Sequence, residues 1–243
     1  MKIIIVKDEK AMSNEAARII GRRIIEKPDI VLGLATGGTP VGTYNNLIRY
    51  YEEGLISFNK VTSFNLDEYI GLDKKSPMSY VHFMQDKLFS KVAMDEKKWF
   101  IPQGICENTE KECIDYEKKI KKAGGIDLQL LGIGVNAHIG FNEPGTDFGS
   151  RTQIVDLTQE TIESNARYFY SKEEVPTQAI SMGLRTIMEA KEILLLANGA
   201  SKAEAIKHTV EGPITPDVPA SVLQLHPNVT LIIDEEAAKE LNK

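Results

Sequence analysis

Short apolar runs alternate with longer stretches of helical period along most of the chain, and this alternation is the feature that most constrains the fold. Residues 127–133 and 192–197 are apolar almost throughout, as in strands buried on both faces of a parallel sheet. We expect strands at 2–6, 30–35, 61–66, 127–133, 192–197 and 229–233. We expect helices at 12–26, 40–53, 79–90, 110–122, 181–190, 201–211 and 235–242. The pattern predicts an α/β fold with three layers, α/β/α, around a mainly parallel, Rossmann-like central sheet.

No internal repeat, low-complexity tract or linker divides the 243 residues. We therefore expect a single α/β domain over residues 1–243. The stretch from 151 to 176 is polar, with Thr and Glu scattered through it. We expect this stretch to be a mobile lid inserted in the domain.

The charge of the chain argues against a nucleic-acid partner. The formal net charge is −6, so binding along a polyanion would need a local basic face. The densest cationic run, residues 118–122, comes just before Gly124 and Gly125. Cations favour the last turn of a helix and Gly ends it, so we interpret this run as a solvated helix end.

The cysteines argue against a metal-binding protein, and the apolar runs argue against a secreted or membrane-spanning one. Cys106 and Cys113 are the only cysteines, without CxxC spacing or a His cluster, so we expect reduced thiols and no metal site. The apolar run at the N-terminus is too short for a signal peptide. No stretch approaches the roughly 18 apolar residues of a membrane span. We expect a soluble, cytoplasmic protein with no membrane association.

Polar clusters follow four of the predicted strands. They are Thr-Gly-Gly-Thr-Pro at 36–40, Asp-Glu-Tyr at 67–69, Gly-Val-Asn-Ala-His at 134–138 and Asn-Gly-Ala-Ser-Lys at 198–202. In an open parallel sheet, ligands bind beyond the carboxyl ends of the strands. The sequence therefore predicts one site built from these four clusters.

The turn at 36–40 has the composition of an anion cradle. Gly37 and Gly38 let backbone N–H groups approach a ligand, and the flanking threonines offer hydroxyls. The Gly-Lys-[Ser/Thr] ending of a nucleotide P-loop is missing. The two glycines alone are equally consistent with a plain turn between strand and helix. Ser201 and Lys202, an N-cap hydroxyl and a cation at a second helix start, favour a phosphorylated small molecule as the ligand.

Two groups of residues are candidates for acid–base chemistry. Asp67 and Glu68 are adjacent at a strand end, where alternation directs one inward and one outward. Burial of the inward carboxylate would raise its pKa toward that of a general base, although a loop or N-cap carboxylate is the alternative. His138 alone would be a structural histidine. With Asn136 before it and Glu143 after it, His138 becomes a candidate acid–base group oriented by its neighbours.

Three motifs together resemble the glucosamine-6-phosphate deaminase family. They are Gly-Gly-Thr-Pro at 37–40, Phe-Asn-Leu-Asp-Glu-Tyr at 64–69 and His-Ile-Gly-Phe-Asn-Glu-Pro-Gly at 138–145. Similar segments at 210–212 and 223–227 extend the resemblance over essentially the whole chain. The resemblance implies isomerisation coupled to deamination in amino-sugar catabolism: glucosamine 6-phosphate and water give fructose 6-phosphate and ammonia. It implies neither a metal nor an organic cofactor, and it allows a monomer or a homo-oligomer.

The resemblance also implies roles for individual residues. Asp67 would move a proton from C2 to C1 of the open sugar, and His138, supported by Glu143 and Asn136, would catalyse ring opening. The implied phosphate ligands are Gly38, Thr39, Arg167 and Lys202, of which Arg167 lies in the predicted lid. We expect further substrate contacts from Thr36, Gly37, Glu68 and Ala137.

Two positions depart from the family's pattern. Many members carry Asp at the position of Asn136, and an amide holds a histidine tautomer without stabilising the imidazolium by charge. We therefore expect a shifted pH profile for ring opening. Activator-regulated members carry basic residues where this chain has Gln153 and Val155. We expect no strong activation by N-acetylglucosamine 6-phosphate.

Three other functions compete with this interpretation. A sugar-phosphate lactonase or a pentose-phosphate isomerase would share the phosphate turn but not both the Asp-Glu-Tyr and Asn-Glu-Pro-Gly motifs. A non-catalytic sensor in a transcription regulator would need a helix-turn-helix, for which we expect no room. A carbohydrate-binding module would not need Asp67, His138 and Glu143 all to be ionisable.

Overall fold

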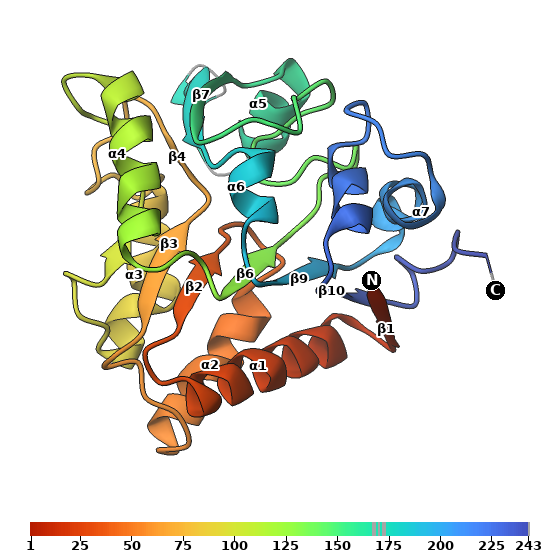
Figure 1. The fold of residues 1–243 in the computed structure, drawn as a ribbon, viewed down its shortest axis with the longest axis horizontal. Helices are drawn as coiled ribbons and strands as arrows, with labels where there is room; N and C mark the ends of the chain where they lie inside the picture. Colours follow the sequence, from red (N-terminus) through yellow and green to blue (C-terminus); the bar gives the residue numbers. More distant parts are fainter. Residues whose placement is uncertain (167–168, 170, 172–173, 243) are drawn as a thin grey trace.

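The computed structural model describes residues 1–166, 169, 171 and 174–242, and its centre is a seven-stranded sheet (Figure 1). Every pairing in this sheet is parallel. The strand order is β1 (Lys2–Val6), β10 (Val229–Asp234), β9 (Glu192–Ala197), β6 (Leu128–Leu131), β2 (Val31–Leu34), β3 (Thr62–Asn65) and β5 (Trp99–Phe100). The predicted parallel α/β architecture is confirmed.

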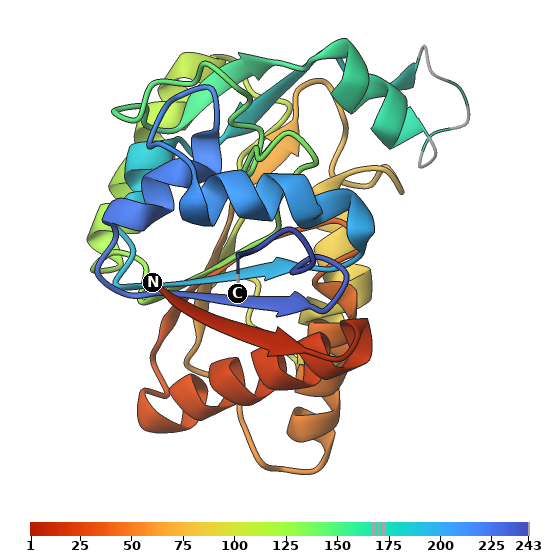
Figure 2. The same cartoon turned by 90° about the vertical axis from the view of Figure 1, so that its right-hand side faces the viewer.

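Helices cover both faces of the sheet (Figure 2). One face carries α1 (Glu9–Glu26), α2 (Val41–Glu52), α3 (Tyr80–Lys87) and the 3-10 turn η1 (Phe89–Val92). The other carries α4 (Thr109–Lys122), α6 (Leu184–Met188), α7 (Ala203–Glu211) and the 3-10 turn η5 (Pro219–Leu225). Within β9, Ile193 and Leu195 pack into one layer, whereas Leu194 and Leu196 pack into the other. This double burial is why the strand is apolar throughout.

A second, antiparallel sheet of three strands accompanies the central sheet. It consists of β4 (Asp67–Tyr69), β8 (Gln178–Ser181) and β7 (Gln153–Asp156). An aromatic cluster packs against it, in which the Tyr69 ring lies 5.7 Å from that of Phe141 and 4.9 Å from that of Tyr80. None of its strands was expected, because each is at most four residues long and β4 follows β3 almost directly.

The expected lid contains regular structure that the sequence did not predict. Residues 151–176 include β7 and the helix α5 (Gln159–Asn165), which begins at the N-cap Thr158. Both elements are short, so neither produces a full amphipathic period. The mobility of this segment stays a prediction.

Two predicted helices differ from those observed. Residues 235–240 form turns rather than the expected helix over 235–242. The Asp234 carboxylate accepts a hydrogen bond from the backbone N–H of Ala237 at 2.8 Å, in the manner of a local turn. The stretch expected as a helix over 181–190 is divided: β8 ends at Ser181 and α6 begins at Leu184.

Among the described residues, none of the helices combines the length and the apolar character that crossing a membrane requires.

Candidate active site

A cavity of about 460 Å³ opens where the parallel strands end. Its lining draws on all four predicted clusters: residues 36–39 after β2, Asp67 after β3, residues 132–136 with His138 after β6, and residues 201–202 after β9. The shared carboxyl edge of the strands therefore brings the clusters together, as the sequence predicts.

The turn after β2 is open toward an incoming ligand. Gly37 has a φ of +89°, and a Cβ built on Gly37 or Gly38 would meet no atom within 4 Å. α2 begins directly after this turn, at the N-cap Pro40, which contributes no side-chain cap. Exposed N–H groups and the positive end of a helix favour an anion at this position.

The second predicted part of the anion site, Ser201 and Lys202, differs from the expectation in its local structure. Ser201 does not N-cap α7, so that expectation is wrong: it lies in the 3-10 turn η4 (Ala200–Lys202), and Lys202 is the N-cap residue. The extra turn carries both side chains to the cavity lining. The Asp234 carboxylate fixes the start of this turn by accepting two 3.0 Å hydrogen bonds from the N–H of Gly199.

Asp67 is a buried carboxylate in the cavity wall, 6% exposed. Burial, with a smaller contribution from the charge of Glu68, raises the pKa of Asp67 to about 8. A Cβ built on Gly140 would lie 3.7 Å from Asp67 Oδ2, so Gly140 leaves space beside the carboxylate. A carboxyl group that titrates near neutrality can both accept and return a proton.

Glu68 points away from the cavity, which agrees with the predicted alternation. Its carboxylate accepts hydrogen bonds from the backbone N–H of Tyr69 and Tyr80 at 3.0 Å and of Val81 at 3.1 Å. Burial raises the pKa of Glu68 to about 7, although these hydrogen bonds favour the ionised form. Glu68 therefore anchors β4 to the start of α3.

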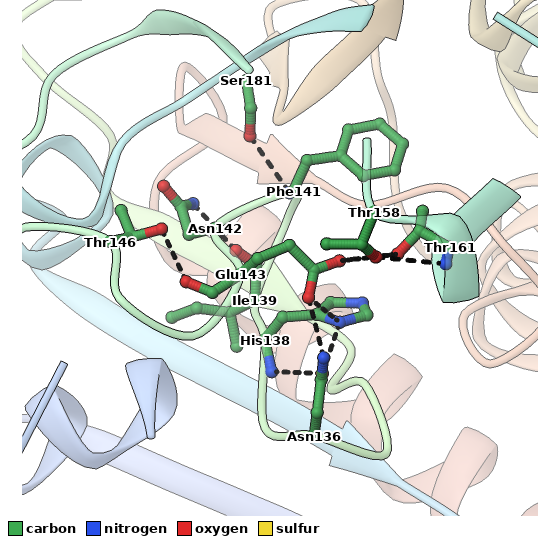
Figure 3. A network of polar contacts seen from close by, with 10 residues as sticks. All are labelled: Asn136, His138, Ile139, Phe141, Asn142, Glu143, Thr146, Thr158, Thr161 and Ser181. Atoms are coloured by element: carbon green, nitrogen blue, oxygen red, sulfur yellow. Dashed lines mark hydrogen bonds and ion pairs between the residues drawn. The ribbon is translucent and has the colours of Figure 1, made fainter. Parts of the chain in front are cut away.

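His138 belongs to a polar network in the loop after β6 (Figure 3). Its Nδ1 lies 2.7 Å from Asn136 Oδ1 and 3.5 Å from Glu143 Oε2. The Asn136 Nδ2 donates to Glu143 Oε2 at 2.7 Å. Because this donation leaves Oδ1 as the acceptor, His138 Nδ1 is the donor toward Asn136 and Nε2 is the basic nitrogen.

The loop also holds Ala137 in an unusual conformation. Ala137 has a φ of +65°, which non-glycine residues rarely adopt. Its carbonyl accepts a 3.0 Å hydrogen bond from the N–H of Ala220 in η5. This conformation allows the residues on either side, Asn136 and His138, to face one another.

Glu143 lies behind His138 rather than in the cavity wall. Burial alone would raise its pKa, but the hydrogen bond and charge of His138, with hydrogen bonds from Thr161 and Asn136, lower the pKa to about 2. Glu143 is therefore ionised near neutral pH.

The structure sorts the expected site residues into three groups. Those that line the cavity are Thr36, Gly37, Gly38, Thr39, Asp67, Asn136, His138 and Lys202. Those that lie outside the lining are Glu68, Ala137 and Glu143. Arg167 lies outside the described residues.

Sequence reasoning gave no role to several residues that line the cavity, among them Tyr80, Phe141 and Thr161. Tyr80 and Thr161 occur outside any motif, so only the folded chain places them at the site. Phe141 lies inside the motif at 138–145, which is the one signal for it.

Within the described part of the chain, no group of three or more His, Cys, Asp or Glu side chains is placed to hold a metal ion.

Together, the parallel sheet and its cavity define a class of three-layer α/β enzymes that place acid–base groups beside an anion-binding turn. Comparison with known proteins identifies the family within this class. The sequence profile of the Glucosamine-6-phosphate isomerases/6-phosphogluconolactonase family matches residues 7–232, and the chain belongs to this family.

Individual relatives are similar over the full chain. A protein of Clostridium novyi (strain NT) is 56% identical, covering 99% of this chain and 100% of its own length. A protein of Clostridium botulinum (strain Loch Maree / Type A3) is 54% identical, covering 100% of this chain and 99% of its own. Both are named glucosamine-6-phosphate deaminase.

Solved structures agree with this placement. The structure of a monomeric glucosamine-6-phosphate deaminase superposes with a TM-score of 0.97 at 49% identity, covering 99% of this chain and 100% of that one. A 6-phosphogluconolactonase from Trypanosoma cruzi superposes with a TM-score of 0.80 at 19% identity, covering 100% of this chain and 97% of that one. The second match shows a shared fold alone.

Proposed function

We propose that the protein converts glucosamine 6-phosphate and water to fructose 6-phosphate and ammonia. The observation that carries the proposal is the position of Asp67 and His138 in one cavity beside an anion cradle. The names of relatives more than half identical to the chain support the same reaction.

The phosphate of the substrate is assigned to the turn at 36–39 and to Lys202. The open backbone at Gly37 and Gly38, the start of α2 and the cation of Lys202 all favour a dianion there. The family resemblance adds Arg167 to this set.

Ring opening is assigned to His138. The hemiacetal must lose the proton of its C1 hydroxyl while its ring oxygen gains one, so a group that exchanges protons near neutrality is required. With Nδ1 held by Asn136, His138 Nε2 accepts the first proton and returns it to the ring oxygen. The ionised Glu143 supports the imidazolium that forms in between.

Isomerisation is assigned to Asp67. The carboxylate removes the C2 proton of the open sugar while the C1 oxygen takes a proton from the substrate ammonium group, which gives an enol amine. Return of the C2 proton to C1 leaves a protonated imine at C2. Water then adds to this imine and ammonia departs. The raised pKa of Asp67 makes its carboxylate a stronger base for the C–H bond, and the cationic amino group of the substrate favours its ionised form.

We also infer that the segment at 151–176 closes over bound substrate. Support comes from α5, which places Thr161 in the cavity lining. A phosphorylated metabolic substrate supports a cytoplasmic location. The relative described as monomeric supports a monomer.

The decisive experiment follows ammonia and fructose 6-phosphate together after purified protein is mixed with glucosamine 6-phosphate. We expect equal amounts of both products. Asp67→Asn should bind the substrate and form almost neither product. Asp29→Asn, at a side chain that is 73% exposed, is the matched control and should leave the rate unchanged. Hydrolysis of 6-phosphogluconolactone without release of ammonia from the amino sugar would contradict the proposal.

A further inference from the structure

The two oxygens of the Glu143 carboxylate have different partners (Figure 3). Oε2 accepts the Asn136 amide and lies near His138, so it faces the imidazole. Oε1 accepts a 2.6 Å hydrogen bond from the hydroxyl of Thr161. The Thr158 hydroxyl, at 3.5 Å from Oε1, donates at 3.0 Å to the hydroxyl of Thr161.

Thr161 differs from the rest of this network in its origin. Asn136, His138 and Glu143 belong to one loop after β6, whereas Thr161 belongs to α5. Its side chain is buried, with 6% of the residue exposed, and it lines the cavity. Its hydroxyl is therefore the link between α5 and the groups around the imidazole.

We propose that Thr161 is a positioning residue for ring opening: its hydrogen bond fixes the Glu143 carboxylate, which in turn orients Asn136 and His138. The inference rests on the proposed function, because it assigns Thr161 to one step of that reaction.

A hydrogen bond to an ionised carboxylate is shorter and stronger than one between neutral groups. The 2.6 Å contact fits this description. Without it, rotation of Glu143 would disturb the 2.7 Å contacts that link Glu143 to Asn136 and Asn136 to His138. Because ring opening depends on the orientation of the imidazole, loss of the Thr161 hydrogen bond should slow proton transfer by His138 more than it weakens substrate binding.

The protonation of Glu143 provides a second readout. The described groups that face its carboxylate are the Asn136 amide, the His138 imidazole and the hydroxyls of Thr158 and Thr161, of which the imidazole is the one ionisable group. The Thr161 hydrogen bond favours the ionised carboxylate, so its removal should raise the pKa of Glu143.

Ring opening can be isolated from the later steps in an Asp67→Asn background. Opening and reclosure interconvert the two anomers of glucosamine 6-phosphate, which exchange NMR spectroscopy measures directly. We expect Thr161→Val to slow this exchange by roughly 10- to 100-fold, the effect of one hydrogen bond to a charged group, while the Kd of the substrate changes little. Thr161→Ser, which keeps the hydroxyl, should restore most of the rate.

Gln159→Ala is the matched control, because Gln159 lies on the same helix with an exposed side chain that contacts Glu163. It should leave the exchange rate unchanged. Equal exchange rates with and without the Thr161→Val substitution would overturn the inference while leaving the proposed function intact. Absence of enzyme-dependent exchange in the Asp67→Asn background itself would contradict the role of His138, and the inference with it.

Carbon NMR titration of the Glu143 carboxyl tests the hydrogen bond without any turnover. Here the Thr161 variants are made without the Asp67→Asn substitution. A higher pKa in Thr161→Val, returned toward the original value in Thr161→Ser, would support the inference. An unchanged pKa in Thr161→Val would overturn it.

Discussion

Gly134→Ala should displace the imidazole of His138, although none of the catalytic side chains is itself substituted. A Cβ at this position would lie 2.3 Å from both Cε1 and Nδ1 of His138 and 2.6 Å from Nε2. Ordinary van der Waals contact begins at 3.4 Å, so the ring would have to retreat by about 1.1 Å. That retreat is large against the 2.7 Å contact between Nδ1 and Asn136 Oδ1. A misplacement of about 1 Å in a catalytic group costs on the order of 100-fold in rate, and we expect kcat to fall by about that factor.

The assay is steady-state release of ammonia, accompanied by urea denaturation to confirm that the variant is folded. Gly149→Ala is the control: it is exposed, its φ is not positive, and its new Cβ would approach only the side chain of Asp147, at 3.3 Å. An unchanged kcat in a folded Gly134→Ala protein would refute the reasoning, because it would mean that the ring position does not limit the reaction.

Three further predictions concern charge and backbone strain. Asn136→Asp places a negative charge beside His138, which favours the imidazolium. Because His138 must be neutral to accept the first proton, the acidic limb of the pH–rate profile should move to higher pH, and an unmoved limb would contradict this account. The folded-state pKa of Asp67, about 8, lies above its ordinary value of 3.8, so the folded form holds a proton that the unfolded form has lost and stability falls as pH rises between these values. Asn at this position does not ionise, so Asp67→Asn lacks this fall in stability with pH. In urea denaturation, the free energy of unfolding of the variant relative to the unaltered protein should therefore be highest at about pH 8 and above. Ala137→Val forces a β-branched residue into the left-handed region at a buried position and should lower the free energy of unfolding by about 2 kcal/mol, whereas Ala137→Gly should change it by less than about 1 kcal/mol. Thermal denaturation of the two variants checks this contrast.

Six of the seven strands of the central sheet were predictable from their apolar runs, whereas β5 was missed because it is only two residues long. Alternate side chains of β9 pack into opposite layers, so an uninterrupted apolar run is the expected signal. The four clusters at the strand ends were predictable for the same reason, since parallel pairing places their loops at one edge. The small sheet lacked any such signal: β4 is three residues long, and its partner β8 is far away in the sequence.

The site was predictable only as far as its residues lie in local motifs. Asn136, His138 and Glu143 lie within one loop, so spacing alone indicated their partnership. Thr161 joins them from α5, a contact that depends on how β7 and α5 pack and that no local pattern encodes. The left-handed conformation of Ala137 was equally hidden, because alanine does not mark a positive φ as glycine does.

The raised pKa of Asp67 follows from the way the chain passes from the central sheet into the small sheet. Leu66 is the residue that connects the two sheets. Its N–H donates to the carbonyl of Leu34 in β2, while its carbonyl accepts from the N–H of Met182, directly after β8. β3 therefore ends in the central sheet and β4 starts in the small one, with Asp67 at the junction. A residue between two sheets loses water on both sides, and this desolvation is the main cause of its raised pKa. The same backbone path that builds the fold thus sets the basicity of the group assigned to C2.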